Sequence, residues 1–168
     1  MGIQINDCMM KKLGLLFILI SLFAFGSKAQ DLKEINGVYY ADSLAYTGKY
    51  VTHHPNGKIK IEMNLENGLK NGTVNVYFEN GQLNEVRSYK NNQMNGSWIT
   101  YNEQKVLIGL ANYKDGQKHG TWMIWDANGN LMYELHYNMG EKVGIWRNFG
   151  KNGEIINERE YPEKTKAQ

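Results

Sequence analysis

The chain has 168 residues, of which 42% are hydrophobic and 12% aromatic, and its formal net charge is +2. A charge this close to zero argues against the basic surface that neutralises phosphates on nucleic acids. The single cysteine, Cys8, excludes an intramolecular disulfide and a site built from several thiolates.

Residues 1–29 have the pattern of a cleavable export signal. Lys11 and Lys12 form a positive start, the run from Leu13 to Phe25 is apolar, and Ser27-Lys28-Ala29 places small residues where a signal peptidase reads them. A spanning helix needs about 20 apolar residues, so the shorter run favours a signal peptide over a membrane anchor. We therefore predict an exported chain, periplasmic or secreted, with no stable membrane insertion after cleavage.

Removing that segment changes the charge and the cysteine content. It holds three of the 19 basic residues and one of the 17 acidic residues, so the remaining chain is close to neutral. Neutrality argues against both nucleic acid and anionic lipid as partners. Cys8 precedes the apolar run, whereas a lipidated cysteine follows such a run. The mature chain therefore has no thiol, and packing with backbone pairing must stabilise it.

Residues 30–47 come before any regular pattern and contain one β-rich run, Val38-Tyr39-Tyr40. We interpret this segment as an N-terminal cap for the part that follows. At the other end, residues 162–168 are mostly charged or polar, so we predict a disordered tail.

A 24-residue repeat occupies residues 48–161 without insertion or deletion. It divides the chain into five units, 48–71, 72–95, 96–119, 120–143 and 144–161, which begin with Gly48, Gly72, Gly96, Gly120 and Gly144. The residues two positions after these glycines are Tyr50, Val74, Trp98, Trp122 and Trp146. A fixed period of this kind is typical of repeat architectures, in which each unit packs on its neighbours.

Each unit has the pattern of a hairpin. Asn-Gly recurs at Asn56-Gly57, Asn80-Gly81, Asn128-Gly129 and Asn152-Gly153, which predicts type I′ turns between two strands. A looser turn, as at Asn67-Gly68, Asp115-Gly116 and Met139-Gly140, is expected to lead to the next unit. The third unit has Gln104-Lys105 instead of Asn-Gly, so its turn should be strained or of another type. The fold class is therefore all-β: an elongated antiparallel β-meander of five 24-residue, two-strand repeats.

Alternation of side chains predicts which residues share a face. In unit 4, Leu131, Tyr133, Leu135 and Tyr137 should lie together. Trp98, Trp122 and Trp146 are expected to form a structural ladder with the repeat glycines. A second column lies three residues further on, hence on the opposite face unless a bulge intervenes. Four of its members are the candidate partner-binding stripe: Tyr77, Tyr101, Trp125 and Phe149.

Catalytic and metal chemistry find little support in the sequence. The adjacent His53 and His54 should point to opposite faces, and no usual ligand spacing occurs, so we predict no metal site and no cofactor. Glu62, Glu134 and Glu158 recur at one repeat position, which we interpret as a solvated ladder beside lysines rather than as paired catalytic acids. We expect that the protein is not an enzyme.

Several motifs together resemble the MORN-repeat variant of bacterial YwqK-type proteins. They are Tyr46-Thr47-Gly48-Lys49-Tyr50, His54-Pro55-Asn56-Gly57-Lys58 and the run from Lys114 to Trp122, and the resemblance spans Val38 to Tyr161. Members of that group are labelled antitoxins or immunity proteins, so the resemblance implies protein binding. MORN repeats in general serve as scaffolds and sometimes contact lipids.

The sequence therefore supports two alternative functions. The first is an exported, non-catalytic, monomeric repeat scaffold that binds a protein partner, in the manner of an antitoxin or immunity protein. The alternative is a repeat protein that binds a cell-envelope glycan, because aromatic side chains with polar neighbours also suit sugar rings.

The export signal makes a direct prediction. Mass spectrometry of the exported protein should find its amino terminus at Gln30, because the small residues before that position complete the cleavage pattern. A membrane-bound product that retains the segment from Lys11 to Phe25 would contradict it.

Overall fold

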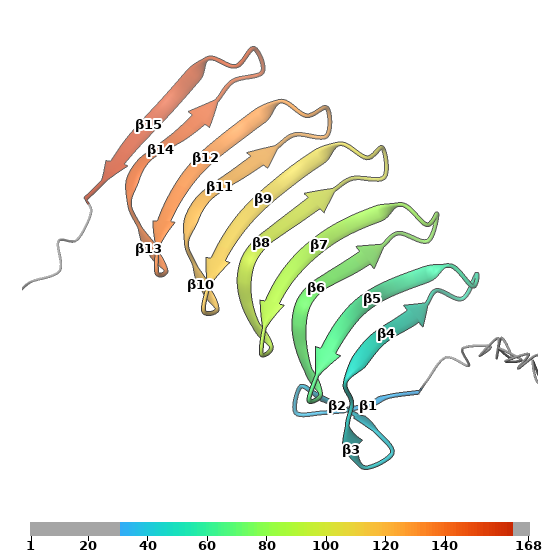
Figure 1. Cartoon of the computed structure of the whole chain (residues 1–168). Helices are drawn as coiled ribbons and strands as arrows, with labels where there is room; N and C mark the ends of the chain where they lie inside the picture. The colour runs from blue at the N-terminus through green and yellow to red at the C-terminus, as the bar shows by residue number, and fades with distance from the viewer. Residues whose placement is uncertain (1–30, 163–168) are drawn as a thin grey trace, which may run out of the picture.

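The computed structural model describes residues 31–162, which are all-β (Figure 1). Within them there is no helix that is long and apolar enough to cross a membrane. The predicted signal peptide, residues 1–29, and tail residues 163–168 lie outside the described residues.

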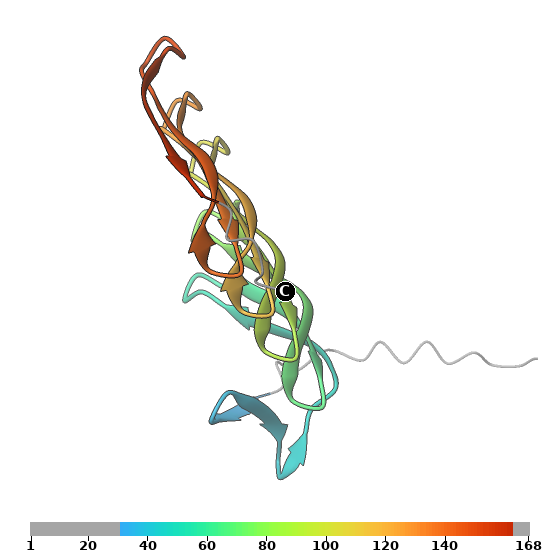
Figure 2. The same cartoon turned by 90° about the vertical axis from the view of Figure 1, so that its left-hand side faces the viewer.

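Residues 48–161 form one antiparallel sheet in which strands that follow each other in sequence are neighbours in space. The predicted all-β meander is confirmed. Figure 2, a side view, shows the hairpins stacked in a single twisted layer. The strands are β4 (Gly48–His53), β5 (Ile59–Glu66), β6 (Leu69–Tyr77), β7 (Leu83–Lys90), β8 (Gln93–Tyr101), β9 (Leu107–Lys114), β10 (Gln117–Lys118), β11 (Gly120–Trp125), β12 (Leu131–Asn138), β13 (Glu141–Lys142), β14 (Gly144–Phe149) and β15 (Ile155–Tyr161).

A separate three-stranded sheet precedes the first repeat: β1 (Lys33–Ile35), β2 (Val38–Ala41) and β3 (Leu44–Ala45). Its central residue, Tyr39, is buried with Met63, Leu65 and Val74 in the main core cluster. The Tyr39 amide also donates to the carbonyl of Gly68 over 2.9 Å. Burial, followed by a hydrogen bond with Glu34, raises the pKa of the Tyr39 hydroxyl. Residues 33–45 thus close the end of the sheet where β4 and β5 lie.

The turns differ from the predicted types. At the Asn-Gly sites only the glycine has a positive φ, as at Gly57 (82°) and Gly129 (88°). The Gly57 amide donates to the carbonyl of His54 over 2.9 Å, and the His54 amide donates to the carbonyl of Lys58 over 2.8 Å. This pair of bonds describes a three-residue loop with a bulge. Two-residue turns with positive φ at both positions occur instead at the connections we expected to be looser, such as Asn67 (50°) and Gly68 (76°). The type I′ prediction was therefore assigned to the wrong end of the hairpin.

Lys105 occupies the glycine position of the third Asn-Gly-type loop. Its φ is 62°, and its amide donates to the carbonyl of Asn102 over 2.9 Å. In each other unit the glycine amide likewise donates to the carbonyl three residues earlier. The loop keeps its geometry and holds a lysine in the left-handed region, which costs an ordinary residue about 1 to 2 kcal/mol. Strain at this turn was predicted and is present, but the turn type is unchanged.

The tight turns link neighbouring units. The Gly116 amide donates to the carbonyl of Met94, and the Gly140 amide donates to that of Lys118, both over 2.8 Å. Each of these bonds joins a turn glycine to the residue two positions after the equivalent turn position one unit earlier. Backbone pairing therefore continues across unit boundaries at the turns as well as along the strands.

A β-bulge in each hairpin corrects the predicted face of Leu131. Ile124 pairs with Tyr133, but the next residue, Trp125, pairs with Leu131, so Met132 is the extra residue. Since paired residues share a face, Leu131 lies with Trp125 rather than with Tyr133. The same shift occurs between Val76 and Tyr77 and between Thr100 and Tyr101.

These turns predict opposite effects at two equivalent positions. Gly129→Val should lower the free energy of unfolding by more than about 1 kcal/mol, because φ is positive there and an added Cβ would lie 3.2 Å from a Val106 methyl. Lys105→Gly should raise it by about 1 kcal/mol by removing left-handed strain.

Urea unfolding measures both changes. Lys105→Ala is the matched control, because alanine keeps the strained φ and should give no comparable gain. Destabilisation by Lys105→Gly would show that the assignment of strain is wrong.

Candidate functional site

The sheet has two faces with different chemistry. One, the ladder face, carries the tryptophan column and the tyrosines of the second strands. Ring centroids along it are 4.9 to 6.2 Å apart, in the order Trp98, Tyr113, Trp122, Tyr137, Trp146 and Tyr161. The tryptophans therefore contact tyrosines of the adjacent strands rather than each other, and the rings form a continuous aromatic ladder.

Hydrogen bonds and cations fix these rings. The indole nitrogen of Trp122 donates to the carbonyl of Asn112, and that of Trp146 donates to the carbonyl of His136, each over 2.9 Å. Lys118 Nζ lies 4.6 Å from the centre of the Trp122 ring, and Lys142 Nζ lies 4.4 Å from that of Trp146. Such cation–π contacts are favourable at partly exposed sites. Partial burial also raises the pKa of the Tyr113 hydroxyl.

The opposite face carries a row of four apolar side chains that we call the aliphatic row: Val86, Ile99, Leu110 and Met123. They follow one another by direct strand pairing across β7, β8, β9 and β11. All four are half-buried, and in the described residues no second layer covers them. The face that carries this row is the aliphatic face.

Charged pairs lie at both ends of the same cross-strand row. On one side Glu62 forms an ion pair with Lys49 and accepts a hydrogen bond from the Tyr77 hydroxyl. These contacts lower the pKa of Glu62, with Lys49 as the main cause. On the other side Arg147 lies 3.2 Å from Glu134 and 3.6 Å from Glu158. An apolar centre is thus bounded by charges.

The predicted partner-binding stripe lies on this aliphatic face, beside the aliphatic row. Tyr77, Tyr101, Trp125 and Phe149 are all half-buried, and they pair with Leu83, Leu107, Leu131 and Ile155 across the bulges. Partial burial, together with the bond to Glu62, raises the pKa of the Tyr77 hydroxyl. Tyr101 lines a hollow of about 230 Å³ with Leu83 and Lys105. The stripe is neither fully exposed nor covered by other residues of the described chain.

Sequence reasoning missed the aliphatic row itself. Its signal was an interruption of the glutamate column, in which Val86 and Leu110 replace the glutamate of units 1, 4 and 5. Strand pairing then places them next to Ile99 and Met123. The glutamates and the apolar side chains thus belong to one cross-strand row, which is apolar at its centre and charged toward its ends.

The side chains of His119 and His136 take part in local contacts. His136 Nδ1 lies 3.2 Å from the Thr121 hydroxyl, and its Nε2 lies 3.4 Å from Glu134. His119 Nδ1 accepts from the Met139 amide over 3.4 Å. In residues 31–162 no group of three or more His, Cys, Asp or Glu side chains is arranged to hold a metal.

The two tryptophans of unit 4 should respond differently to truncation. Trp122→Ala removes two ring contacts, an indole hydrogen bond and the Lys118 contact, so it should cost about 3 to 5 kcal/mol. Trp125→Ala should cost less than about 2 kcal/mol. Trp146→Ala, with the same set of contacts as Trp122, is the matched control. Equal melting temperatures for the Trp122 and Trp125 variants would show that both columns serve as core.

Residues 46–67, 70–91 and 118–139 each match the MORN repeat variant family, whereas no curated protein matches the chain. Two of the matches include the hairpins β4–β5 and β11–β12 with their loops. Three hairpins of this single-layer sheet thus match the MORN repeat variant family.

Proposed function

We propose that this protein is an exported, non-catalytic repeat scaffold that binds a protein partner through its aliphatic face, in the manner of an antitoxin or immunity protein. The observation that carries the proposal is the aliphatic row, four apolar side chains in line on a sheet face that no second layer covers. Contiguous apolar surface of this kind marks interaction sites on soluble proteins.

The surroundings of the row have the anatomy of a protein interface. Four strands at about 4.8 Å spacing give an apolar centre roughly 14 Å across. Tyr101 and Trp125 lie beside it, and aromatic side chains are enriched among residues that dominate binding energy. The Lys49–Glu62 and Arg147–Glu134 pairs form a polar rim. Rim charges of this kind contribute to specificity and association rate.

The resemblance to YwqK-type proteins supports the antitoxin role within this proposal. The predicted export signal favours a partner in the cell envelope, where an immunity protein would act on a toxin outside the cytoplasm. A cell-envelope glycan is the alternative ligand, and the experiment below separates the two.

The test is a pull-down from envelope extract with the purified chain as bait. We expect recovery of one protein, and we expect Leu110→Glu to abolish it by placing a charge in the centre of the aliphatic row. Trp125→Ala should weaken capture by about 2 kcal/mol, the effect typical of an aromatic anchor.

Leu44→Glu is the matched control, because Leu44 is 77% exposed in β3, outside the main sheet. Both acidic variants should retain the circular dichroism spectrum of the parent chain. Recovery of glycan in place of protein would favour the alternative. Protein capture that survives Leu110→Glu would exclude the aliphatic face as the binding surface.

A further inference from the structure

The last strand, β15, is one edge of the main sheet, and within the described residues it pairs with β14 alone. Every residue of β15 except the last is exposed, whereas the equivalent strands β7 and β9 are half-buried in all but their last residue. The difference lies in their neighbours, because β7 is followed by β8 and β9 by β11. An unpaired edge presents a row of backbone N–H and C=O groups that can pair with another chain.

The repeat shows which backbone groups of β15 face outward. The Val143 amide donates to the carbonyl of His136 over 3.1 Å, and the Trp146 indole nitrogen donates to the same carbonyl over 2.9 Å. His136 therefore directs its backbone at the next strand, and alternate residues of β12 do the same. Glu160 stands 24 positions after His136. The backbone groups of Glu160 and Glu158 thus face outward, where an added strand would bond to them.

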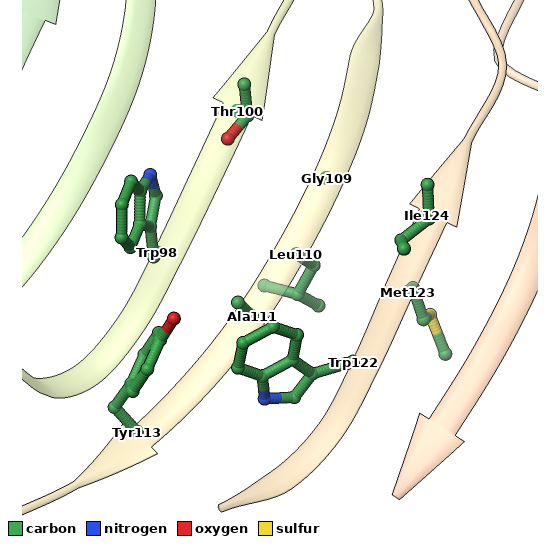
Figure 3. A pocket seen from close by; sticks show the side chains of 9 residues that line it. All are labelled: Trp98, Thr100, Gly109, Leu110, Ala111, Tyr113, Trp122, Met123 and Ile124. Atoms are coloured by element: carbon green, nitrogen blue, oxygen red, sulfur yellow. The ribbon is translucent and has the colours of Figure 1, made fainter. Parts of the chain in front are cut away.

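The aromatic ladder is also incomplete at this edge. In Figure 3 the rings of Trp98, Tyr113 and Trp122 come from three successive strands, and Tyr113 lies 6.2 and 5.1 Å from the two tryptophan rings. Tyr161, at the same repeat position, has one ring neighbour in the described part of the chain, Trp146 at 4.9 Å. An aromatic residue on an added strand would supply the second neighbour.

Arg159 indicates where such a ring would lie. Its equivalent in unit 2 is Arg87, whose guanidinium lies 4.5 Å from the centre of the Trp98 ring on the next strand. Unit 3 has Ala111 at this position, which leaves a hollow of about 240 Å³ (Figure 3). Arg159 instead lies over Tyr161 of its own strand, 5.0 Å from the ring centre. By this equivalence, Arg159 would turn to the face of an incoming ring and form a cation–π contact with it.

The charges of β15 restrict the other side of an added strand. Glu158 and Glu160 are exposed on the aliphatic face. In unit 4 the equivalent of Glu158 is Glu134, which lies 3.2 Å from Arg147 of the next strand. Arg147 also lies 3.6 Å from Glu158, on its β14 side. A basic residue on the added strand would repeat at the outer side of Glu158 the contact that Arg147 makes with Glu134.

A second copy of the chain fits this edge poorly. A two-fold axis that pairs β15 with β15 keeps each residue on its own face, so Glu158 and Glu160 would face a strand with no basic residue on that side. Like charges directly opposite each other are destabilising, and Arg159 lies on the ladder face. The other edge of the sheet, β4, is partly closed, because the Tyr46 hydroxyl donates to the carbonyl of Lys49 over 3.1 Å.

We propose that β15 binds an extended strand of a partner protein, which adds to the sheet in antiparallel orientation. The strand carries an aromatic residue against Tyr161 and Arg159 on the ladder face and a basic residue against Glu158 or Glu160 on the aliphatic face. Residues 163–168 contain no aromatic side chain, so they do not supply this ring. The site is a sheet edge, apart from the aliphatic row, so it goes beyond the proposed function and can fail without affecting it.

A synthetic peptide of residues 141–149 tests the proposal, because these residues pair with the outer edge of β12. The peptide carries Trp146 and Arg147 on opposite faces. Fluorescence anisotropy of the labelled peptide should show saturable binding to the purified full chain, with one peptide per chain. Trp146→Ala in the peptide should weaken binding at least about tenfold, as truncation of an aromatic anchor does. Absence of saturable binding would overturn the proposal.

Backbone methylation of the peptide separates strand addition from side-chain contact. Because Arg147 is paired directly with Glu134, its N–H would point toward β15, and the N–H of Trp146 would point away. N-methylation at Arg147 should abolish binding. N-methylation at Trp146 is the matched control and should weaken binding less than about threefold. Equal losses from the two methylated peptides would rule out pairing with the edge.

Two variants of the chain locate the site on β15. Glu158→Pro removes an outward N–H group and leaves the bonds to β14 in place, since proline is tolerated on an edge strand. It should abolish peptide binding, whereas Glu158→Ala keeps the N–H group and should weaken binding only a few-fold. Urea unfolding checks that the proline variant folds, and the methylated peptides decide the question if it does not. Unchanged binding by a folded Glu158→Pro variant would exclude β15.

Sedimentation equilibrium examines a second copy as the occupant of the edge. We expect a monomer at every concentration used in the peptide titration, with or without Glu158→Pro. A dimer or longer assembly that Glu158→Pro dissociates would assign the edge to another copy of this chain and overturn the proposal.

Discussion

The structure depends on one constraint: the sheet is a single layer. A two-layer domain buries side chains between its layers, whereas few of the described hydrophobic residues here are buried, and most of those lie near the N-terminal end. Packing must therefore run along the sheet, from each strand to the next. The aromatic ladder meets that need because rings about 5 Å apart match the spacing between strands. The repeat glycines, such as Gly120 (76°), have a positive φ where the chain enters each strand of the ladder.

A single layer also leaves both faces available for function. Packing of the rings on the ladder face stabilises the sheet. The side chains at the centre of the aliphatic face are therefore not needed for that purpose. Val86 and Leu110 can then replace glutamates without damage to packing, since the row they join is uncovered. Likewise the change to Ala111 opens space in the ladder face while Trp98, Tyr113 and Trp122 keep the rings in series. Variation from unit to unit therefore changes surface chemistry and leaves the fold intact.

The repeat period was enough to predict the meander, the strand positions and the opposite faces of the Trp122 and Trp125 columns. It was not enough for the turns, because Asn-Gly is compatible both with a two-residue type I′ turn and with the three-residue loop found at Asn56-Gly57. The loop length depends on the bulge, and a bulge such as that beside Trp125 leaves no mark in the alternation of side chains. The aliphatic row depends on register between strands from different units, which a column-by-column comparison of repeats does not reveal.

The bonds between successive tight turns have a consequence for how the molecule comes apart. Because the Gly140 amide is held by Lys118 and the Gly116 amide by Met94, each unit relies on the one before it. The N-terminal end has Tyr39 packed against it, whereas β15 is exposed along most of its length, with Ile156 63% exposed. Local stability should thus decline along the array, and hydrogen exchange should begin at β15 and move inward one hairpin at a time. The sheet would therefore unfold from its C-terminal end while the N-terminal end stays packed. A ligand bound near β15 would then slow the unfolding of the whole array.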